Sequence, residues 1–158
     1  MTQDLRKDLV AQMKNRALIY LEMYDVLCAE AGTAKAEELL TRAIFRRGLA
    51  AGKSLARHAP ADLAGLKASF LAAVPGGEEI FRPQVLRSDT EALEILLHGC
   101  PLKDAWHEAG LAEEKVATLC RIAGAVDKGL FEGAGFKFEN RTWTPGAKGC
   151  CFLSVRRG

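Results

Sequence analysis

Hydrophobic residues recur at spacings of three and four along residues 1–75, which is the pattern of amphipathic helices. We expect a first helix from Asp4, which can cap it, to about Glu30. A second helix is expected from Thr33 to the region of Leu55, and a short third helix follows before the Pro-Gly-Gly breaker.

Two glycines, Gly48 and Gly52, lie one turn apart in the predicted second helix. Glycine lowers helix propensity, so we expect a packing reason, namely the close approach of another helix. This notch suits a homodimer and a monomeric core equally.

The pattern changes after the breaker. The stretches 79–87 and 91–99 are rich in Ile, Phe, Val and Leu and flank Ser88-Asp89-Thr90, which predicts a β-hairpin. Pro101 then begins a short helix, and a longer one is expected over 112–133.

The chain ends with two strand-like stretches, 135–144 and 149–156, joined by Pro145-Gly146. Two hairpins with no crossover helix between paired strands favour an antiparallel sheet with helices on one face. We therefore predict one α+β domain over 1–158, with a helical part up to residue 75 and the candidate site in the remainder.

Composition narrows the function classes. A chain of 158 residues with 49% hydrophobic residues is typical of one globular domain, and a net charge of +2 gives no nucleic-acid footprint. Basic residues gather only over 42–57, where helical spacing favours a solvated face over a site for acidic ligands. Without a secretory signal or a membrane-length apolar run, we expect a soluble, cytoplasmic protein with no membrane partner.

The chain has five cysteines and no CxxC pair, which in a reducing compartment indicates free thiols. Cys28 lies in a helical stretch and is expected to pack as a small hydrophobe. The other four, in the last third of the chain, are the candidates for chemistry: Cys100, Cys120, Cys150 and Cys151.

Cys100 directly precedes Pro101, which makes it the expected N-cap of a helix. The amides and the positive end of the helix dipole favour a thiolate there, so Cys100 is the candidate nucleophile. The alternative is a thiol that fills the corner between strand and helix. His98, two residues earlier, could serve as its base or could simply be hydrogen-bonded structure.

Cys120 and Asp127 are seven residues apart on the predicted long helix, so they share its apolar face about 10 Å apart. Burial there would raise the pKa of Asp127, and the two groups could bracket a small molecule. The alternatives are that Cys120 is plain core and that Asp127 pairs with Lys128 or Arg121 at the edge of the stripe.

The adjacent cysteines take opposite faces of the last strand. Cys151 aligns with Leu153 and is expected in the core, whereas Cys150 is expected to face a pocket or the open face of the sheet. A divalent metal on Cys100, Cys120 and Cys150 is an alternative, although these spacings lack the short paired ligands of structural zinc sites. No other cofactor is indicated.

The second half of the chain resembles the L-2-amino-thiazoline-4-carboxylic acid hydrolase family. The resemblance is clearest from about Ile80 to Arg156. The segments that carry it are Cys100-Pro-Leu-Lys-Asp-Ala-Trp, Gly110-Leu, Leu119-Cys120-Arg-Ile-Ala, Asp127-Lys-Gly, Gly135-Phe136, Thr142-Trp-Thr-Pro-Gly146 and Gly149-Cys150-Cys151-Phe152.

This resemblance implies hydrolytic opening of a C–N bond in a small cyclic sulfur heterocycle. In this hypothesis Cys100 attacks an amidine-like carbon, Asp127 moves a proton, and Arg141 or Arg87 meets the substrate carboxylate. The candidate site comprises Cys100, Asp127, Cys120, Cys150 and His98 for chemistry, and Arg141, Trp143 and Trp106 for substrate contact. For Trp106, packing is the alternative role.

The layout is also similar to ligand-binding domains of the 4-vinyl-reductase type, which sense small molecules and can hold a metal through cysteines. This similarity implies a second function, a non-catalytic binding or sensor domain. Thr142 stands where one of their late cysteines would be, which argues against a zinc site.

Overall fold

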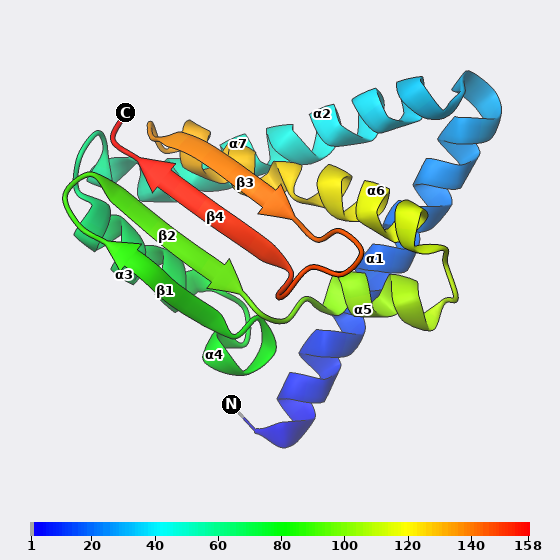
Figure 1. Ribbon diagram of the computed structural model, residues 1–158, viewed down its shortest axis with the longest axis horizontal. Coiled ribbons are helices and arrows are strands. Elements are labelled where there is room, and N and C mark those ends of the chain that lie inside the picture. Colours follow the sequence, from blue (N-terminus) through cyan, green and yellow to red (C-terminus); the bar gives the residue numbers. More distant parts are fainter. Residues whose placement is uncertain (1) are drawn as a thin grey trace.

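The computed structural model describes residues 2–158. Two long helices, α1 (Gln3–Ala31) and α2 (Thr33–Gly52), meet at Gly32, whose positive φ of 80° lets the chain turn sharply (Figure 1). The predicted helices are present, but Thr2 rather than Asp4 caps α1, because its side chain accepts a hydrogen bond from the amide of Leu5.

The next segment connects the long helices to the sheet. It consists of a 3₁₀ helix η1 (Lys53–His58), α3 (Leu63–Ala73) and the single turn α4 (Gly77–Ile80). The first strand was expected to begin at Glu79 but begins at Pro83. Gly76 and Gly77, both with positive φ, turn the chain into α4 and so delay the strand.

Four strands form one antiparallel sheet, as predicted from the two hairpins. They are β1 (Pro83–Ser88), β2 (Ala92–Leu97), β3 (Lys137–Thr142) and β4 (Cys151–Arg156). Their order is β1-β2-β4-β3, so the second strand of each hairpin lies in the centre and the two hairpins pair through β2 and β4 (Figure 1).

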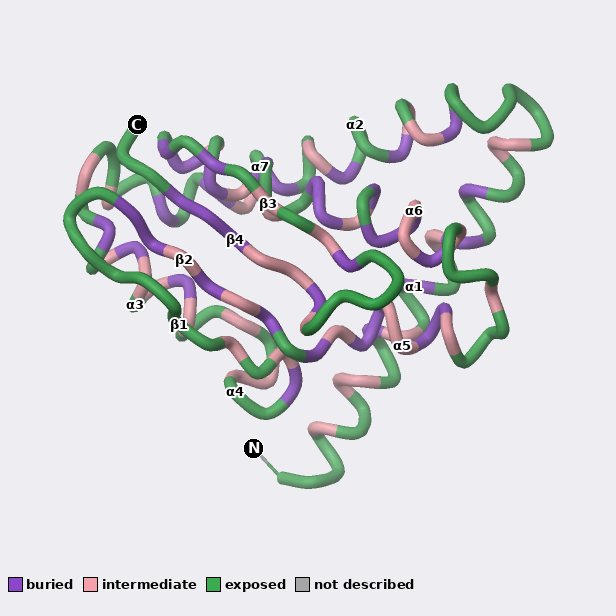
Figure 2. Tube along the Cα trace, viewed as in Figure 1, coloured by how far each residue is buried: buried purple, intermediate pink, exposed green. Residues whose placement is uncertain are grey.

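One face of the sheet is buried against helices, which confirms the predicted α+β arrangement (Figure 2). Leu93, Ile95, Leu153 and Val155 on the two central strands are fully buried. They pack in one hydrophobic cluster with Phe131 of the helix that precedes β3 and with residues of α3.

The predicted helix over 112–133 is two helices, α6 (Glu113–Ala123) and α7 (Ala125–Gly133). The break lies at Gly124, whose carbonyl oxygen accepts a hydrogen bond of 3.1 Å from Nδ2 of Asn140 on β3. A Cβ at Gly124 would lie 2.6 Å from the Thr142 side chain, so the contact with β3 requires a glycine here.

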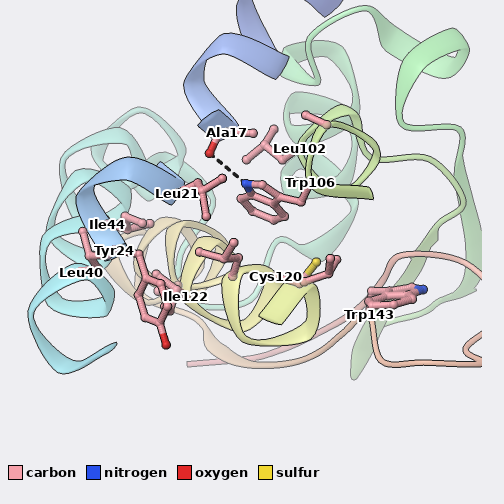
Figure 3. Packing of buried hydrophobic residues seen from close by; sticks show 14 of the residues in the cluster. Ala17, Leu21, Tyr24, Leu40, Ile44, Leu102, Trp106, Cys120, Ile122 and Trp143 are labelled. Atoms are coloured by element: carbon pink, nitrogen blue, oxygen red, sulfur yellow. Dashed lines mark hydrogen bonds between the residues drawn. The ribbon is translucent and has the colours of Figure 1, made fainter. Parts of the chain in front are cut away.

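A second hydrophobic cluster joins α1 and α2 to α6 and to α5 (Pro101–Glu108). At its centre Trp106 is completely buried and donates a hydrogen bond of 2.8 Å from Nε1 to the carbonyl of Ala17 (Figure 3). This contact anchors α5 to α1, because indole N–H groups need a partner when they are buried.

The helices α2 and α7 pack backbone against backbone, which confirms the close approach predicted from Gly48 and Gly52. A Cβ at Gly48 would lie 2.9 Å from the Cα of Gly129 and closer still to the carbonyl oxygen of Val126. Gly133 similarly faces the backbone of α2.

We expect Gly48→Ala to destabilise the protein by about 2–3 kcal/mol, because the added methyl overpacks a backbone contact. This sign is opposite to that of helix propensity, which favours Ala over Gly. Thermal unfolding should show a melting temperature lower by roughly 5–10 °C. Ala50→Ser, on the exposed side of the same helix, should leave it unchanged; equal melting of both variants would contradict the close packing.

Within residues 2–158, no helix combines the length and the apolar character needed to cross a membrane.

Candidate functional site

A cavity of about 460 Å³ lies between the sheet and the helices, where the two hydrophobic clusters meet. Its volume is in the range typical of small-molecule sites. Cys100, Cys120, Asp127 and Cys150 all line it. Four candidates chosen from three separate parts of the sequence therefore come together in one cavity.

Cys100 is the N-cap of α5 and Pro101 is its first residue, as predicted. The expected lowering of its pKa is wrong: burial raises the pKa of the Cys100 thiol. The amides of Lys103 and Leu102 act in the opposite direction, although neither makes a hydrogen bond of standard geometry with the thiol. The start of α5 therefore offsets part of the rise in the Cys100 pKa that burial causes, but not all of it.

The other thiols of the cavity are also protonated at neutral pH. Burial raises the pKa of Cys120 to about 12 and that of Cys150 to about 11, and in both cases the nearby Cys100 adds to the shift. Burial also raises the pKa of Cys151. None of these groups is a thiolate in the free protein.

The adjacent cysteines do not divide between core and pocket as predicted, because Cys151 lines the cavity together with Cys150. Cys151 also packs against the cluster beneath the sheet. Cys150 precedes the first residue of β4, and its Sγ donates to the carbonyl oxygen of His98 at 3.7 Å. Since Cys150 lies outside the regular strand, the alternation of faces does not separate the two side chains.

Asp127 lies in the first turn of α7 and has neither of the ion-pair partners considered from the sequence. Arg121 pairs with Glu37, and Lys128 lies near Glu132. Asp127 is half-buried and lines the cavity. Burial without a compensating cation raises the pKa of this carboxyl to about 7, which is the direction predicted from the sequence.

His98 lies outside the cavity, which corrects its proposed pairing with Cys100. Its side chain is exposed, and Nε2 lies 2.8 Å from Oε1 of Gln84 on β1. The chain leaves β2 at Leu97, so the alternation that would have aligned His98 with Cys100 does not extend that far.

The two arginines expected to meet a substrate carboxylate are also elsewhere. Arg141 is exposed and lies over the ring of Phe152, 4.4 Å from the ring centroid. Its neighbours Phe138 and Thr142 on β3 face the helices, so alternation directs Arg141 to the open face of the sheet. Arg87 is exposed and pairs with Asp89 at 2.6 Å.

Both tryptophans proposed for substrate contact are among the residues that line the cavity. Trp106 belongs to α5. Trp143 follows β3 and meets the His107 ring edge-on at a centroid distance of 4.9 Å. Trp106 is itself completely buried in the cluster that joins α5 to α1, which is the packing role considered for it.

Sequence reasoning missed three cations that line the cavity: Arg16 on α1, Arg47 on α2 and Lys103 on α5. A signal for Arg47 was present, because it follows Ile44 by three residues and precedes Ala51 by four, on the buried side of the helix. Arg47 was not considered for the site because all the basic residues over 42–57 were assigned to a solvated face.

A metal site on the three thiols is not supported. Across residues 2–158, no group of three or more His, Cys, Asp or Glu side chains is arranged to hold a metal ion. Cys100, Cys120 and Cys150 thus share the cavity without forming a ligand set.

Comparison with known proteins gives one family and two similar structures. Residues 12–153 match the family model of L-2-amino-thiazoline-4-carboxylic acid hydrolase. No curated protein matches the chain.

One similar structure is a trafficking protein particle complex subunit 3 from Naegleria fowleri covalently bound to palmitic acid. Its TM-score is 0.58 and its identity 14%, and the match covers 94% of this chain and 96% of that one. Another is the phenol-responsive sensory domain of the transcription activator PoxR with phenol. Its TM-score is 0.55 and its identity 14%, with 99% of this chain and 92% of that one covered. At this identity both show a likeness of fold alone.

Proposed function

Because the chain belongs to the L-2-amino-thiazoline-4-carboxylic acid hydrolase family, we propose that it hydrolyses a C–N bond in a cyclic or amidine-like small molecule bound in the cavity. The observation that carries this proposal is that Cys100 and Asp127 line one cavity, and that Asp127 forms no ion pair with any residue of 2–158. A nucleophile and a proton acceptor are the two groups such a reaction needs.

Asp127 takes the role of base that was first considered for His98. With a pKa of about 7, the carboxyl is present in both protonation states near neutral pH, which suits a group that accepts and returns a proton. Cys100 is a thiol in the resting protein, so it needs such a base.

In the proposed reaction, Sγ of Cys100 attacks the amidine-like carbon while its proton passes to Asp127. The C–N bond then breaks, the leaving nitrogen takes the proton from Asp127, and the carbon remains bonded to sulfur. Water then attacks that carbon and loses a proton to Asp127, the C–S bond breaks, and the departing sulfur takes the proton back from Asp127 to restore the Cys100 thiol. The start of α5 stabilises the thiolate that forms in the first and last steps.

Cys120 and Cys150 have a different part in this proposal. Their pKa values of about 12 and 11 keep them protonated, so they are weak hydrogen-bond donors and apolar walls rather than nucleophiles. Trp143, which lines the same cavity, adds an aromatic contact for a planar substrate ring.

The direct test is to incubate the purified protein with 2-amino-thiazoline-4-carboxylate and measure the ring-opened product by mass spectrometry. We expect turnover that depends on enzyme concentration and rises as the pH passes through 7, because Asp127 must be ionised to act as base. No product at any pH from 6 to 9, with the protein shown to be folded by circular dichroism, would overturn hydrolysis of this substrate.

A second function, ligand binding without chemistry, is favoured by the protonated state of all four cavity thiols. The two similar structures carry phenol and covalently bound palmitic acid respectively, so related folds hold small organic molecules. Saturable binding of a ligand with no turnover would favour this function over hydrolysis.

A further inference from the structure

Three cations line the cavity, and they differ in whether a carboxylate lies beside them. Lys103 lies near Asp104, with Nζ 3.0 Å from Oδ1. Arg16 and Arg47 are exposed and come from two different helices, yet both line the same cavity. Among the side chains of residues 2–158, no carboxylate lies within ion-pair distance of either guanidinium, and neither donates a hydrogen bond to a side chain or carbonyl.

The remainder of the cavity is largely hydrophobic. Its walls on the side of α3 and the sheet are formed by Leu55, Phe70, Val74, Phe81 and Leu97. All five belong to the cluster under the sheet or pack against it, and Leu55, Phe70 and Leu97 are themselves buried. A ligand that fills this part must be apolar.

We propose that the natural ligand of the cavity is an amphipathic organic acid, with its anionic head at Arg16 and Arg47 and an alkyl or aryl body among the apolar walls. The inference rests on the proposed use of this cavity as the functional site, and it names a bulkier substrate class than the small heterocycle of the family name. Guanidinium groups bind carboxylates through paired, charge-assisted hydrogen bonds.

The volume supports a ligand of this size. A cavity of about 460 Å³ accommodates drug-sized molecules, whereas a small zwitterion would leave the apolar walls in contact with water. Each methylene that enters such a site strengthens binding about fourfold. Chain length and head-group charge should therefore contribute separately to affinity.

The chain has two tryptophans, and both line the cavity, so intrinsic fluorescence reports on its occupancy. The probes are decanoate, hexanoate and the uncharged decanol, each titrated below its aggregation concentration. We expect saturable binding of decanoate. Hexanoate should bind about 250-fold more weakly, because four methylenes are lost, and decanol roughly tenfold more weakly, because the head group no longer meets the arginines.

Variants identify the residues of the head-group site. Arg16→Gln and Arg47→Gln should each weaken decanoate binding about three- to tenfold, a moderate loss because both side chains are exposed, and should leave decanol binding unchanged. Arg46→Gln is the matched control, since Arg46 is exposed on the same helix and does not line the cavity. Equal binding of decanoate and decanol, or equal effects of all three variants, would overturn the anionic head-group site.

The outcomes also separate this inference from hydrolysis. Turnover of 2-amino-thiazoline-4-carboxylate without any binding of decanoate would overturn the amphipathic class and leave the hydrolase intact. Binding of decanoate that depends on Arg16 and Arg47, in a protein that turns over no substrate, would support the ligand class and remove the catalytic proposal.

Discussion

Cys100→Ala should lower the turnover of 2-amino-thiazoline-4-carboxylate by roughly a thousandfold or more, the loss typical of removing a nucleophile. The residue lines the cavity at the first turn of α5, where a developing thiolate meets the backbone amides of that helix. The side chain is small, so the stability of the fold should fall by no more than about 1 kcal/mol.

Cys28→Ala is the matched control, because Cys28 is a half-buried thiol of α1 that does not line the cavity. Its turnover should equal that of the unmodified protein. Cys100→Ser, which keeps the shape but is a poorer nucleophile, should lie near the alanine variant. If Cys100→Ala retains full activity, the attacking group is water activated by Asp127, and the covalent step is wrong.

Asp127→Asn should stabilise the protein above pH 7 while it removes the proposed base. The pKa of Asp127 is raised to about 7 in the folded protein, against an ordinary value near 3.9, so between these values the folded state binds more protons than the unfolded state. Stability therefore falls as the pH rises through this window. The penalty is complete above pH 7 and is on the order of 4 kcal/mol.

The asparagine stays neutral, so it avoids this penalty. Urea unfolding at pH 5 and pH 8 should show a gain for Asp127→Asn that is larger at pH 8. Asp8→Asn, at an exposed position of α1, should show no such growth with pH. A gain that is constant or smaller at pH 8 would mean that Asp127 is ionised at its ordinary pH, and the base assignment would lose its support.

The order of elements was predictable because its signals are local. Helical spacing, the breaker at Pro75 and two alternating hairpin patterns gave helices followed by an antiparallel sheet. Gly48 and Gly52 revealed a close helix contact, because glycine in a helix needs a packing reason. The break at Gly124 was not predictable, since its cause is Asn140 on a strand that folds back from later in the chain.

The sequence predicted several residues of the site correctly, but it predicted their protonation and their exact positions less well. Cys100, Cys120, Asp127 and Cys150 were chosen from caps and stripes, and one cavity contains them all. The direction of the Cys100 pKa was wrong because the local helix end was visible in the sequence and the depth of burial was not. His98 and Arg141 were misplaced for another reason, because the ends of strands and the faces of a sheet depend on strand pairing, which the sequence does not show.

The position of the cavity between the two hydrophobic clusters has a further consequence. A bound molecule would contact both clusters at once, so it would contribute to the packing of the hydrophobic core. Because only the folded chain offers this site, a ligand at a hundred times its dissociation constant would add about 2.7 kcal/mol to the free energy of unfolding. The abundance of the protein in a cell would then follow the supply of its ligand, since unliganded molecules unfold and are degraded more often.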